Sequence, residues 1–339
     1  MRQTEEKTLM GVILGFITGA SLLASALVAV WMIGAIFYDL CGGAKWGRGV
    51  ALAWAAGVIA ILVVWRPLCQ PIVALLGAES LFLAWWYRLK PSNDRDWDPS
   101  MAVLPRAVIA GDAVTIENVR NLEYRSIDDF KPQFEIRTYH LSNIEGVDVV
   151  FFDWGDGIRG HPALVFDFGR DGRICMSIEA RITKGQEYSV FRSLYRQQEL
   201  IFVAADERDV ILRRTKYSEN QWGYLYRLTS SVEELRRVFL DYVNMINHLY
   251  ESPRWYHVLF TNCTTSFYKL PSTKVRWDWR VIANARLDRA LYQAGRLDRT
   301  LPFKELRRLA YLNDIANTAP ATGFGDHIRR ELERRRHER

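Results

Sequence analysis

The residues best suited to chemistry begin at Asn262-Cys263, in the stretch Phe-Thr-Asn-Cys-Thr-Thr-Ser-Phe-Tyr-Lys-Leu-Pro at 260–271. Asn is a favoured N-cap residue, and Pro271 limits the helix that follows to the residues before it. Cys263 would then open a short helix, where unpaired backbone N–H groups and the helix dipole stabilise a thiolate. We assign the cap and an oxyanion hole to Asn262 and Thr264, because the same N–H groups can bind an oxyanion.

A thiolate nucleophile needs a base, and the base needs a group that orients it. His161 begins a predicted strand and Glu179 lies on the neighbouring strand, so this pair can supply both roles. His257 is a rival base, six residues before the cysteine, from where reaching back to the sulfur is awkward. His140 and His248 have no acidic neighbour on a predicted shared face. We therefore predict a Cys–His–Glu site with His161 as its base, although a lone cysteine near a helix start is more often a buried, inert thiol.

The strands that carry the predicted base and carboxylate form the clearest hairpin, over 161–168 and 173–182, with apolar residues at the even positions of both. The turn between them, Gly-Arg-Asp-Gly at 169–172, suits a three-residue loop with Gly172 in the left-handed conformation, which pairs residue 169 with 173. Even residues then face even residues, and one face is wholly apolar. The odd face carries His161, Cys175, Ser177, Glu179 and Arg181, with Glu179 diagonally across from His161.

The rest of the soluble part is predicted to mix short strands with helices. Strands are expected at 113–116, 134–139, 147–154, 201–205 and 210–212. A helix begins at Ser231 with Glu234 three residues on, which is the pattern of a capping box. Its apolar stripe is Leu235, Phe239, Tyr242, Ile246 and Leu249. Residues 281–339 are mostly helical in composition, with Pro302 and Pro320 as breaks. The sequence therefore predicts an α+β domain.

The N-terminal part is predicted to cross a membrane. Residues 8–38 and 49–65 carry no charge, and 67–87 is interrupted only by Glu79. A bilayer core of roughly 30 Å needs about 20 apolar residues in a helix. We predict three spans, near 9–37, 49–65 and 68–87; two spans, with 67–87 interfacial or re-entrant, are the alternative.

Two details refine this N-terminal part. Arg66 and Pro67 separate the last two runs, and a proline there suits a helix start. Glu79 should face a neighbouring helix or a polar cavity, because an ionisable group in lipid is costly. The third run ends in Trp-Trp-Tyr at 85–87, which is typical of a membrane–water interface. Charge alone leaves the orientation in the membrane open.

Composition excludes several classes of protein. The net charge of +6 comes from mixed charges, including an arginine-rich end at 329–339 that is interleaved with glutamates. No basic–aromatic motif suggests nucleic acid as a partner. The four cysteines, Cys41, Cys69, Cys175 and Cys263, form no CxxC pair, so neither a zinc knuckle nor a thioredoxin motif is supported. We expect no cofactor and no metal.

Several long segments resemble one known family. They are KPSNDRDW (90–97), VTIENVRNLEYRS (114–126), RTYHLS (137–142), GHPALVFDFGRDGRICMSIEAR (160–181), EYSVFRSLYRQQELIFVAADERDVI (187–211) and WYHVLFTNCTT (255–265). Together they resemble the Lnb N-terminal periplasmic domain family, long described as a domain of unknown function, from Lys90 to about Pro271. The resemblance implies a bacterial inner-membrane protein with its globular domain in the periplasm, and kinship with proteins that N-acylate lipoproteins. Three spans would then require a cytoplasmic N-terminus.

The order His–Glu–Cys is also similar to a circularly permuted papain-like fold of the NlpC type, shared with lecithin-retinol acyltransferases. That resemblance implies His161 as the base, Cys263 as the nucleophile and, less securely, Glu179 as the third polar group. Gly160 and Pro162 depart from the commonest residues beside the His, and Pro162 can alter how the strand begins.

These observations predict four segments: a membrane anchor at 1–89, a linker with lead-in strands at 90–135, a papain-like thiol domain at 136–275 and a helical extension at 276–339. The expected function is a membrane-anchored thiol acyltransferase or acyl hydrolase, with membrane phospholipid as donor and water or an amine, such as a lipoprotein N-terminus, as acceptor. A cell-wall cysteine peptidase or amidase acting on peptidoglycan peptides and a non-catalytic envelope protein are the alternatives. The sequence leaves donor, acceptor and oligomeric state open.

Overall fold

The computed structural model describes residues 2–64, 69–157, 159–272 and 286–338, which fall into two compact units. One unit comprises residues 1–91 together with 191–197, and the other comprises 92–190 and 198–339. The sequence predicts that Arg66 and Pro67 separate the last two spans. Both residues lie outside the described part of the chain.

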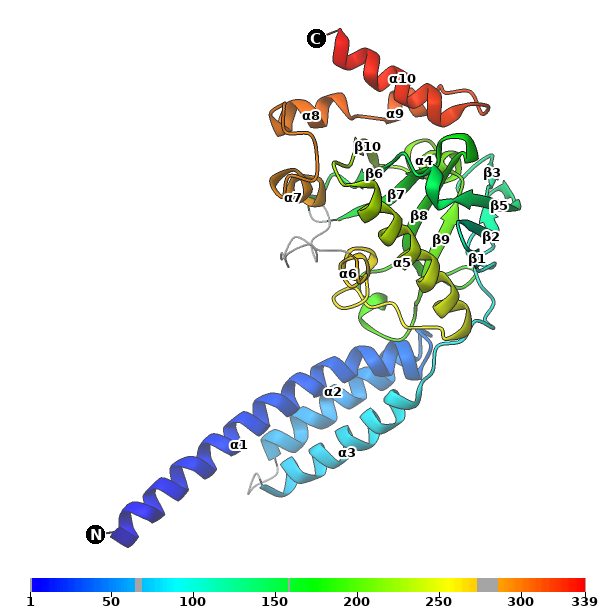
Figure 1. Ribbon diagram of the computed structural model, residues 1–339. Coiled ribbons are helices and arrows are strands. Elements are labelled where there is room, and N and C mark those ends of the chain that lie inside the picture. Colours follow the sequence, from blue (N-terminus) through cyan, green and yellow to red (C-terminus); the bar gives the residue numbers. More distant parts are fainter. Residues whose placement is uncertain (1, 65–68, 158, 273–285, 339) are drawn as a thin grey trace. The chain divides into compact units, whose positions relative to one another are not determined.

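The first unit is built on three helices that lie alongside one another (Figure 1). They are α1 (Arg2–Ala35), continued by the π-helical turn η1 (Ile36–Leu40), then α2 (Gly47–Val64) and α3 (Cys69–Arg88). Among the described residues, Gly11–Leu40 and Gly47–Val64 are long and apolar enough to cross a membrane. Helix α3, which carries Gln70 and Glu79, does not meet that standard. All three predicted segments are therefore helical, and two have the composition of a span.

Polar side chains join the helices of this unit. Ser25 Oγ on α1 donates to Glu79 Oε1 on α3 over 2.8 Å, and both side chains are buried. Trp86 Nε1 donates to Asp39 Oδ2 over 2.6 Å. The prediction that Glu79 faces a neighbouring helix is therefore confirmed.

The segment 191–197, which connects two strands of the other unit, packs with these helices. Tyr195 stacks on Tyr38 with ring centroids 5.3 Å apart. The Arg196 backbone N–H donates to Asp39 Oδ1 over 3.1 Å, and Gln197 Nε2 donates to the Tyr38 carbonyl over 2.9 Å. This short segment therefore belongs to the helical unit although it lies far from it in the sequence.

The second unit is organised by an eight-stranded sheet in the order β1-β2-β9-β8-β7-β6-β10, with β5 also paired to β2. All neighbours are antiparallel except β2 and β9, which meet in parallel at Arg120 and Ala205. A separate two-stranded sheet joins β3 (Glu123–Tyr124) and β4 (Phe130–Lys131). The main strands are β1 (Arg106–Ala110), β2 (Ala113–Arg120), β5 (Phe134–His140), β6 (Gly146–Asp153), β7 (Gly160–Asp167), β8 (Arg173–Arg181), β9 (Glu199–Ala205) and β10 (Trp222–Arg227). The expected α+β class with a mostly antiparallel sheet and packed helices is confirmed.

Helices cover both faces of this sheet, and each face has its own core. Alternate residues of a strand point to opposite faces, so Phe166 joins a core with α5 and α6, whereas Val165 joins a core with α4, α9 and α10. Figure 1 shows α5 running across the strands. The helices are α4 (Glu207–Thr215), α5 (Val232–Glu251), α6 (Cys263–Tyr268), α7 (Leu287–Gln293), α8 (Phe303–Leu309), α9 (Asn313–Ala316) and α10 (Phe324–His337).

The β7–β8 hairpin forms with the predicted parity but in another register. Asp167 pairs with Arg173, so the connection has five residues instead of three, and the predicted pairing of 169 with 173 is wrong. Gly169 and Gly172 both adopt positive φ, at 54° and 86°, which lengthens the turn without strain. A shift of two residues preserves the side-chain alternation, so the even face is apolar as predicted. Continued by two residues, this register brings His161 level with Glu179 rather than diagonally across.

One predicted strand is wrong, and β1 and β10 were not predicted. Residues 210–212 belong to helix α4, because Asp206 caps its first turn by accepting from the Arg208 N–H over 2.9 Å. Acidic residues in the first turn and Arg213 and Arg214 in the last turn complement the helix dipole. Strand β10 was not predicted; it completes the sheet beside β6.

The C-terminal helices follow the sequence pattern closely. Helix α5 begins after Ser231, which accepts from the Glu234 N–H, and its five predicted stripe residues are all buried. Pro302 directly precedes α8, and Pro320 lies between α9 and α10.

Helix α10 is attached to the sheet by a partly buried arginine. Arg329 Nε donates to Asp148 Oδ2 over 2.9 Å, and its Nη1 donates to Glu207 Oε2 over 3.0 Å. Both carboxylates are buried. Arg334 on the same helix pairs only with surface glutamates.

We predict that Arg329→Met lowers the free energy of unfolding by about 3–5 kcal/mol, because it removes the ion-pair partner of buried Glu207 and leaves buried Asp148 with Arg227 alone. Arg334→Ala is the matched control and should change it by less than about 0.5 kcal/mol. Thermal unfolding of both variants in detergent measures the difference, and equal stabilities would contradict this account of the attachment.

Candidate active site

Cys263 is the first residue of α6, held there by Asn262. Asn262 Oδ1 accepts from the backbone N–H groups of Thr264 (2.9 Å) and Thr265 (2.7 Å). The Thr265 hydroxyl in turn accepts from the Asn262 N–H over 2.8 Å, which completes a capping box. The predicted cap is confirmed. The Thr264 N–H, which was predicted to contribute to an oxyanion hole, already donates to Asn262 Oδ1 in this cap.

The sulfur of Cys263 lies in a buried environment. Only 6% of the residue is exposed, and burial raises the pKa of its thiol more than a hydrogen bond with Thr264 lowers it. The resting side chain is therefore a neutral thiol, since burial outweighs the stabilisation of a thiolate expected at the helix start. The backbone N–H of Cys263 donates to the hydroxyl of Tyr256.

His161, at the start of β7, has a defined tautomer. Its Nε2 lies 2.8 Å from Ser177 Oγ, and Ser177 Oγ donates to Glu179 Oε1, also over 2.8 Å. A serine hydroxyl has one hydrogen, so its oxygen must accept a hydrogen bond from the Nε2–H of His161. Nδ1 then carries the lone pair, and among the described residues this nitrogen makes no hydrogen bond. His161 is arranged to accept a proton at Nδ1.

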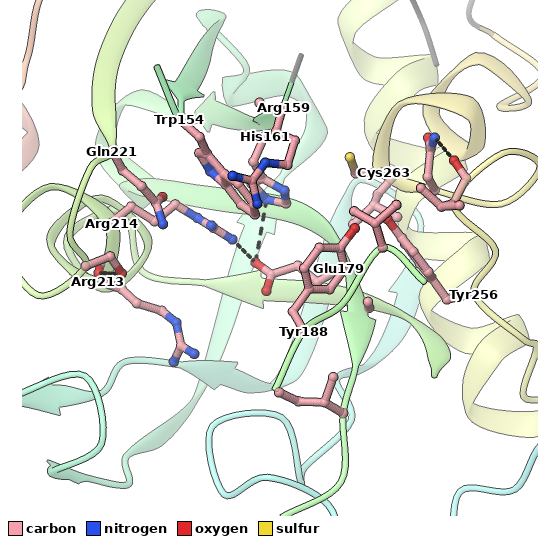
Figure 2. Close-up of a pocket in the computed structure, with 18 of the residues that line it drawn as sticks. Trp154, Arg159, His161, Glu179, Tyr188, Arg213, Arg214, Gln221, Tyr256 and Cys263 are labelled. Carbon is pink, nitrogen blue, oxygen red and sulfur yellow. Dashed lines mark hydrogen bonds and ion pairs between the residues drawn. The ribbon is translucent and has the colours of Figure 1, made fainter. Parts of the chain in front are cut away.

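Glu179 is an ionised carboxylate inside the protein. Burial would raise its pKa, but Arg214 first, and then His161 and Arg120, hold the pKa well below its usual range. Arg214 Nη2 lies 3.1 Å from Glu179 Oε1, and Figure 2 shows this pair beside His161. Burial, and next the charge of Arg214, lower the pKa of His161 to about 3. The imidazole is therefore neutral near pH 7.

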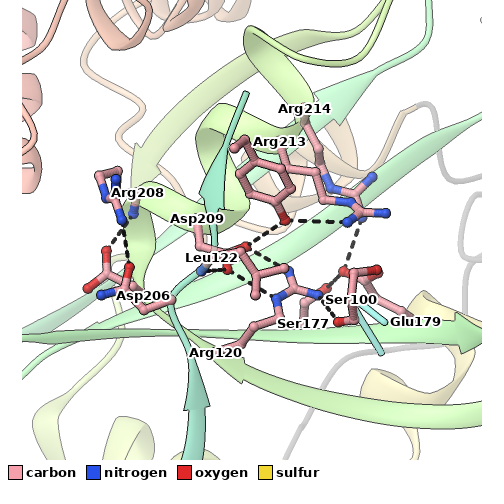
Figure 3. A network of polar contacts seen from close by, with 12 residues as sticks. Ser100, Arg120, Leu122, Ser177, Glu179, Asp206, Arg208, Asp209, Arg213 and Arg214 are labelled. Atoms are coloured by element: carbon pink, nitrogen blue, oxygen red, sulfur yellow. Dashed lines mark hydrogen bonds and ion pairs between the residues drawn. The ribbon is translucent and has the colours of Figure 1, made fainter. Parts of the chain in front are cut away.

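The helix that carries Arg214 is fixed by a second buried ion pair. Arg120 on β2 contacts Asp209 on α4 through Nε (3.2 Å) and Nη2 (2.9 Å), and the Leu122 N–H donates to the same carboxylate over 2.7 Å (Figure 3). The pair is almost completely buried. Paired charges of this kind hold two elements in one arrangement, so α4 presents Arg214 to Glu179 at a defined place.

All three predicted catalytic residues line one cavity of about 370 Å³, which we call the Cys263 cavity. Its polar lining includes His161, Glu179, Arg214, Tyr256, Asn262 and Cys263. The sulfur is not a hydrogen-bond partner of His161 in the described part of the chain. The nucleophile and the base therefore line the same cavity, although no hydrogen bond between them is present in the described part of the chain.

The other histidines lie elsewhere. His257 accepts from the Leu259 N–H at Nδ1 over 3.2 Å, stacks on Phe260 and does not line the Cys263 cavity. His140 does have an acidic neighbour, because its Nδ1 lies 2.8 Å from Asp171 Oδ2, so that expectation was wrong. The longer β7–β8 turn is what places Asp171 there.

The roles of two residues of the site were not predicted from the sequence. Ser177 was placed on the correct face of β8 but was given no role, although a hydroxyl two residues before a buried glutamate is a recognisable signal. Arg214 was missed because its segment was taken as strand instead of helix.

Comparison with known proteins gives one match. Residues 130–289 fit the family model of the Lnb N-terminal periplasmic domain. This part of the chain is similar to that family. The predicted resemblance is confirmed, with the match beginning later and ending later than the 90–271 expected. The matched part includes His161, Glu179 and Cys263. No curated protein and no solved structure matches the chain.

The depressed pKa of His161 predicts that this domain is sensitive to acid. The folded protein keeps this imidazole neutral, whereas the unfolded chain takes up a proton below pH 6.5. The unfolded state therefore binds more protons, and stability falls as the pH drops from 6.5 towards about 3.

We expect His161→Gln, which keeps a donor towards Ser177, to lose less stability than wild type between pH 7 and pH 5. Melting temperatures measured at both pH values test this. The ordinary pKa of a glutamate lies below that window, so Glu179 contributes little to it. Identical pH dependence in both proteins would show that His161 is not buried in its neutral form.

Proposed function

We propose that the chain is a membrane-anchored periplasmic thiol acyltransferase or acyl hydrolase acting on lipid esters. The observation that carries the proposal is the neutral His161 with its lone pair at Nδ1, lining the same cavity as the neutral thiol of Cys263. Neither the thiol nor the imidazole carries a charge at rest, and the proton can pass from the thiol to the imidazole as the sulfur attacks. Catalytic hydrogen bonds are often long without substrate and shorten in its presence.

In the proposed reaction, Cys263 Sγ attacks the acyl carbonyl while its proton passes to His161 Nδ1. The tetrahedral oxyanion then collapses, the C–O bond to the alcohol breaks, and His161 returns the proton to the leaving oxygen. The product is a thioester on Cys263. An amine or water next attacks this carbonyl, gives a proton to His161 and releases the sulfur, which takes the proton back.

Two groups could stabilise the oxyanion. The Cys263 N–H is one, since its present acceptor, the Tyr256 hydroxyl, can rotate and become a second donor. Glu179 stays ionised and acts through Ser177, which holds the imidazole in the required tautomer and stabilises it when it becomes charged.

The fold we propose for this domain is the permuted papain-like arrangement of the NlpC type. Its support is the chain order: a histidine beginning a strand, an acidic residue on the next strand, and a cysteine at the start of a helix packed against both. We further propose that α1–α3 form a multi-pass anchor in the bacterial inner membrane. An anchored enzyme suits a substrate that never leaves the lipid.

We predict that Cys263→Ala and His161→Ala each reduce acyl transfer in membranes from a producing strain by at least about 10³-fold, because each removes an obligatory participant. Cys175→Ala is the matched control: this cysteine is buried in the second core and should leave turnover unchanged. Labelled phospholipid and mass spectrometry of acylated products measure the effect. Full turnover in either site variant would refute the assignment.

The same site could serve a cell-wall peptidase or amidase. Digestion of purified peptidoglycan separates the two functions: new fragments that depend on Cys263 would favour the peptidase. A thiol-reactive lipid probe tests the third candidate, a non-catalytic envelope protein. Labelling of Cys263 in wild type, absent from Cys263→Ala, favours the enzyme, whereas a thiol inert to the probe and to iodoacetamide favours the binding protein.

A further inference from the structure

The charges around the Cys263 cavity are unbalanced. Three arginines line it, Arg159, Arg213 and Arg214, and Glu179 is the only acidic residue that the described lining contributes. That carboxylate is already satisfied by Ser177 and Arg214. Arg213 Nη1 donates to an uncharged partner, the Tyr124 hydroxyl, over 3.3 Å. Arg159 pairs with Asp156, which is not part of the lining. The excess positive charge of the cavity therefore rests on Arg213, for which the described residues provide no carboxylate partner.

The same cavity contains buried polar atoms with no hydrogen-bond partner among the described residues. They are Trp154 Nε1, Arg214 Nε and Gln221 Oε1, and all three residues line it. Arg214 is only 9% exposed. A buried donor left unsatisfied costs about 1–3 kcal/mol, so native proteins satisfy such groups with water, an ion or a ligand.

Two of these atoms are N–H donors beside cationic side chains, which is the chemistry that binds an oxyanion. The guanidinium of Arg159 lies 4.7 Å from the centroid of the Trp154 ring. The Gln221 amide can turn its NH₂ towards the same ligand. Phosphate oxygens match such a set well, because they accept several charge-assisted hydrogen bonds at once.

The rest of the lining is apolar. Its members include Met101, Ile178, Ala180, Ile182, Val190 and Val258. In Figure 2, Arg213, Arg214 and Gln221 lie on one side of Glu179, and Cys263 and Tyr256 lie on the other. The cavity thus has cationic donors on the side away from the sulfur. Apolar side chains along its walls can contact hydrocarbon.

We propose that the Cys263 cavity binds the phosphate of a glycerophospholipid, with Trp154 Nε1 and Arg214 Nε as donors and Arg213 supplying further charge. The acyl chain lies along the apolar wall, and its ester reaches Cys263. The inference deepens the proposed function and rests on it for the identity of the reacting ester, whereas phosphate binding can be measured without turnover.

The test is calorimetric titration of the full-length Cys263→Ala protein in a neutral detergent. Three ligands are compared: dihexanoyl phosphatidylglycerol, dihexanoylglycerol, which lacks the phosphate, and inorganic phosphate. We expect the phospholipid to bind at least about tenfold more tightly than the diacylglycerol. Trp154→Phe, which removes only the N–H, and Arg213→Gln should each weaken phospholipid binding about three- to tenfold and leave diacylglycerol binding unchanged.

Arg208→Gln is the matched control, because Arg208 lies on the same helix outside the cavity and should change neither affinity. Equal affinity for both lipids, or equal losses for both in Trp154→Phe, would overturn the phosphate site. Inorganic phosphate that binds more tightly than the phospholipid would identify a site for free anions and also overturn it. If the protein binds phospholipid selectively but the wild type shows no acyl turnover, the phosphate site is supported and the proposed enzyme activity is rejected. If the wild type turns over substrate but binds both lipids equally, the activity is supported and the phosphate site is rejected.

Discussion

The contact between Glu179 and Arg214 is the interaction on which the candidate site depends. A carboxylate as deeply buried as Glu179 would take up a proton if it were alone, and Ser177 would then lose the ionised acceptor that fixes the direction of its hydroxyl. With that direction lost, the tautomer of His161 would no longer be defined. Arg214 prevents this, and its own place is set by the Arg120–Asp209 pair that attaches α4 to β2. A series of paired charges therefore connects strand β2 to the imidazole.

The two sides of the sheet contribute different parts of the cavity. Cys263 belongs to the core that α5 and α6 form with the even residues of β7 and β8. His161 lies against Phe152, which belongs to the opposite core, with ring centroids 6.5 Å apart. These residues can share one cavity only where a strand begins and no longer separates the two faces. The start of β7 at Gly160 is that place.

The sequence was most informative where a local pattern determines the outcome. The Asn262 cap, the Ser231 helix start and the even–odd alternation of β7 and β8 all depend on neighbouring residues, and all were predicted correctly. The hairpin register was not, because a longer turn between Gly169 and Gly172 has the same parity as the shorter one. The role of Arg214 could not be predicted either, since it depends on α4 packing beside β8 and on the distant partner Arg120. The neutral thiol of Cys263 likewise follows from burial, which no local pattern reports.

The assignment of segment 191–197 to the helical unit changes how the two units are connected. The chain passes from one unit to the other three times, at 91–92, 190–191 and 197–198. A single protease cut after Pro91 would therefore leave the units joined through the β8–β9 connection. A polypeptide beginning at Ser92 would keep Tyr195 and Arg196 while losing the aromatic rings they contact, Tyr38 and Trp86. Removing the helices would thus also remove the contacts of segment 191–197, which remains part of the polypeptide.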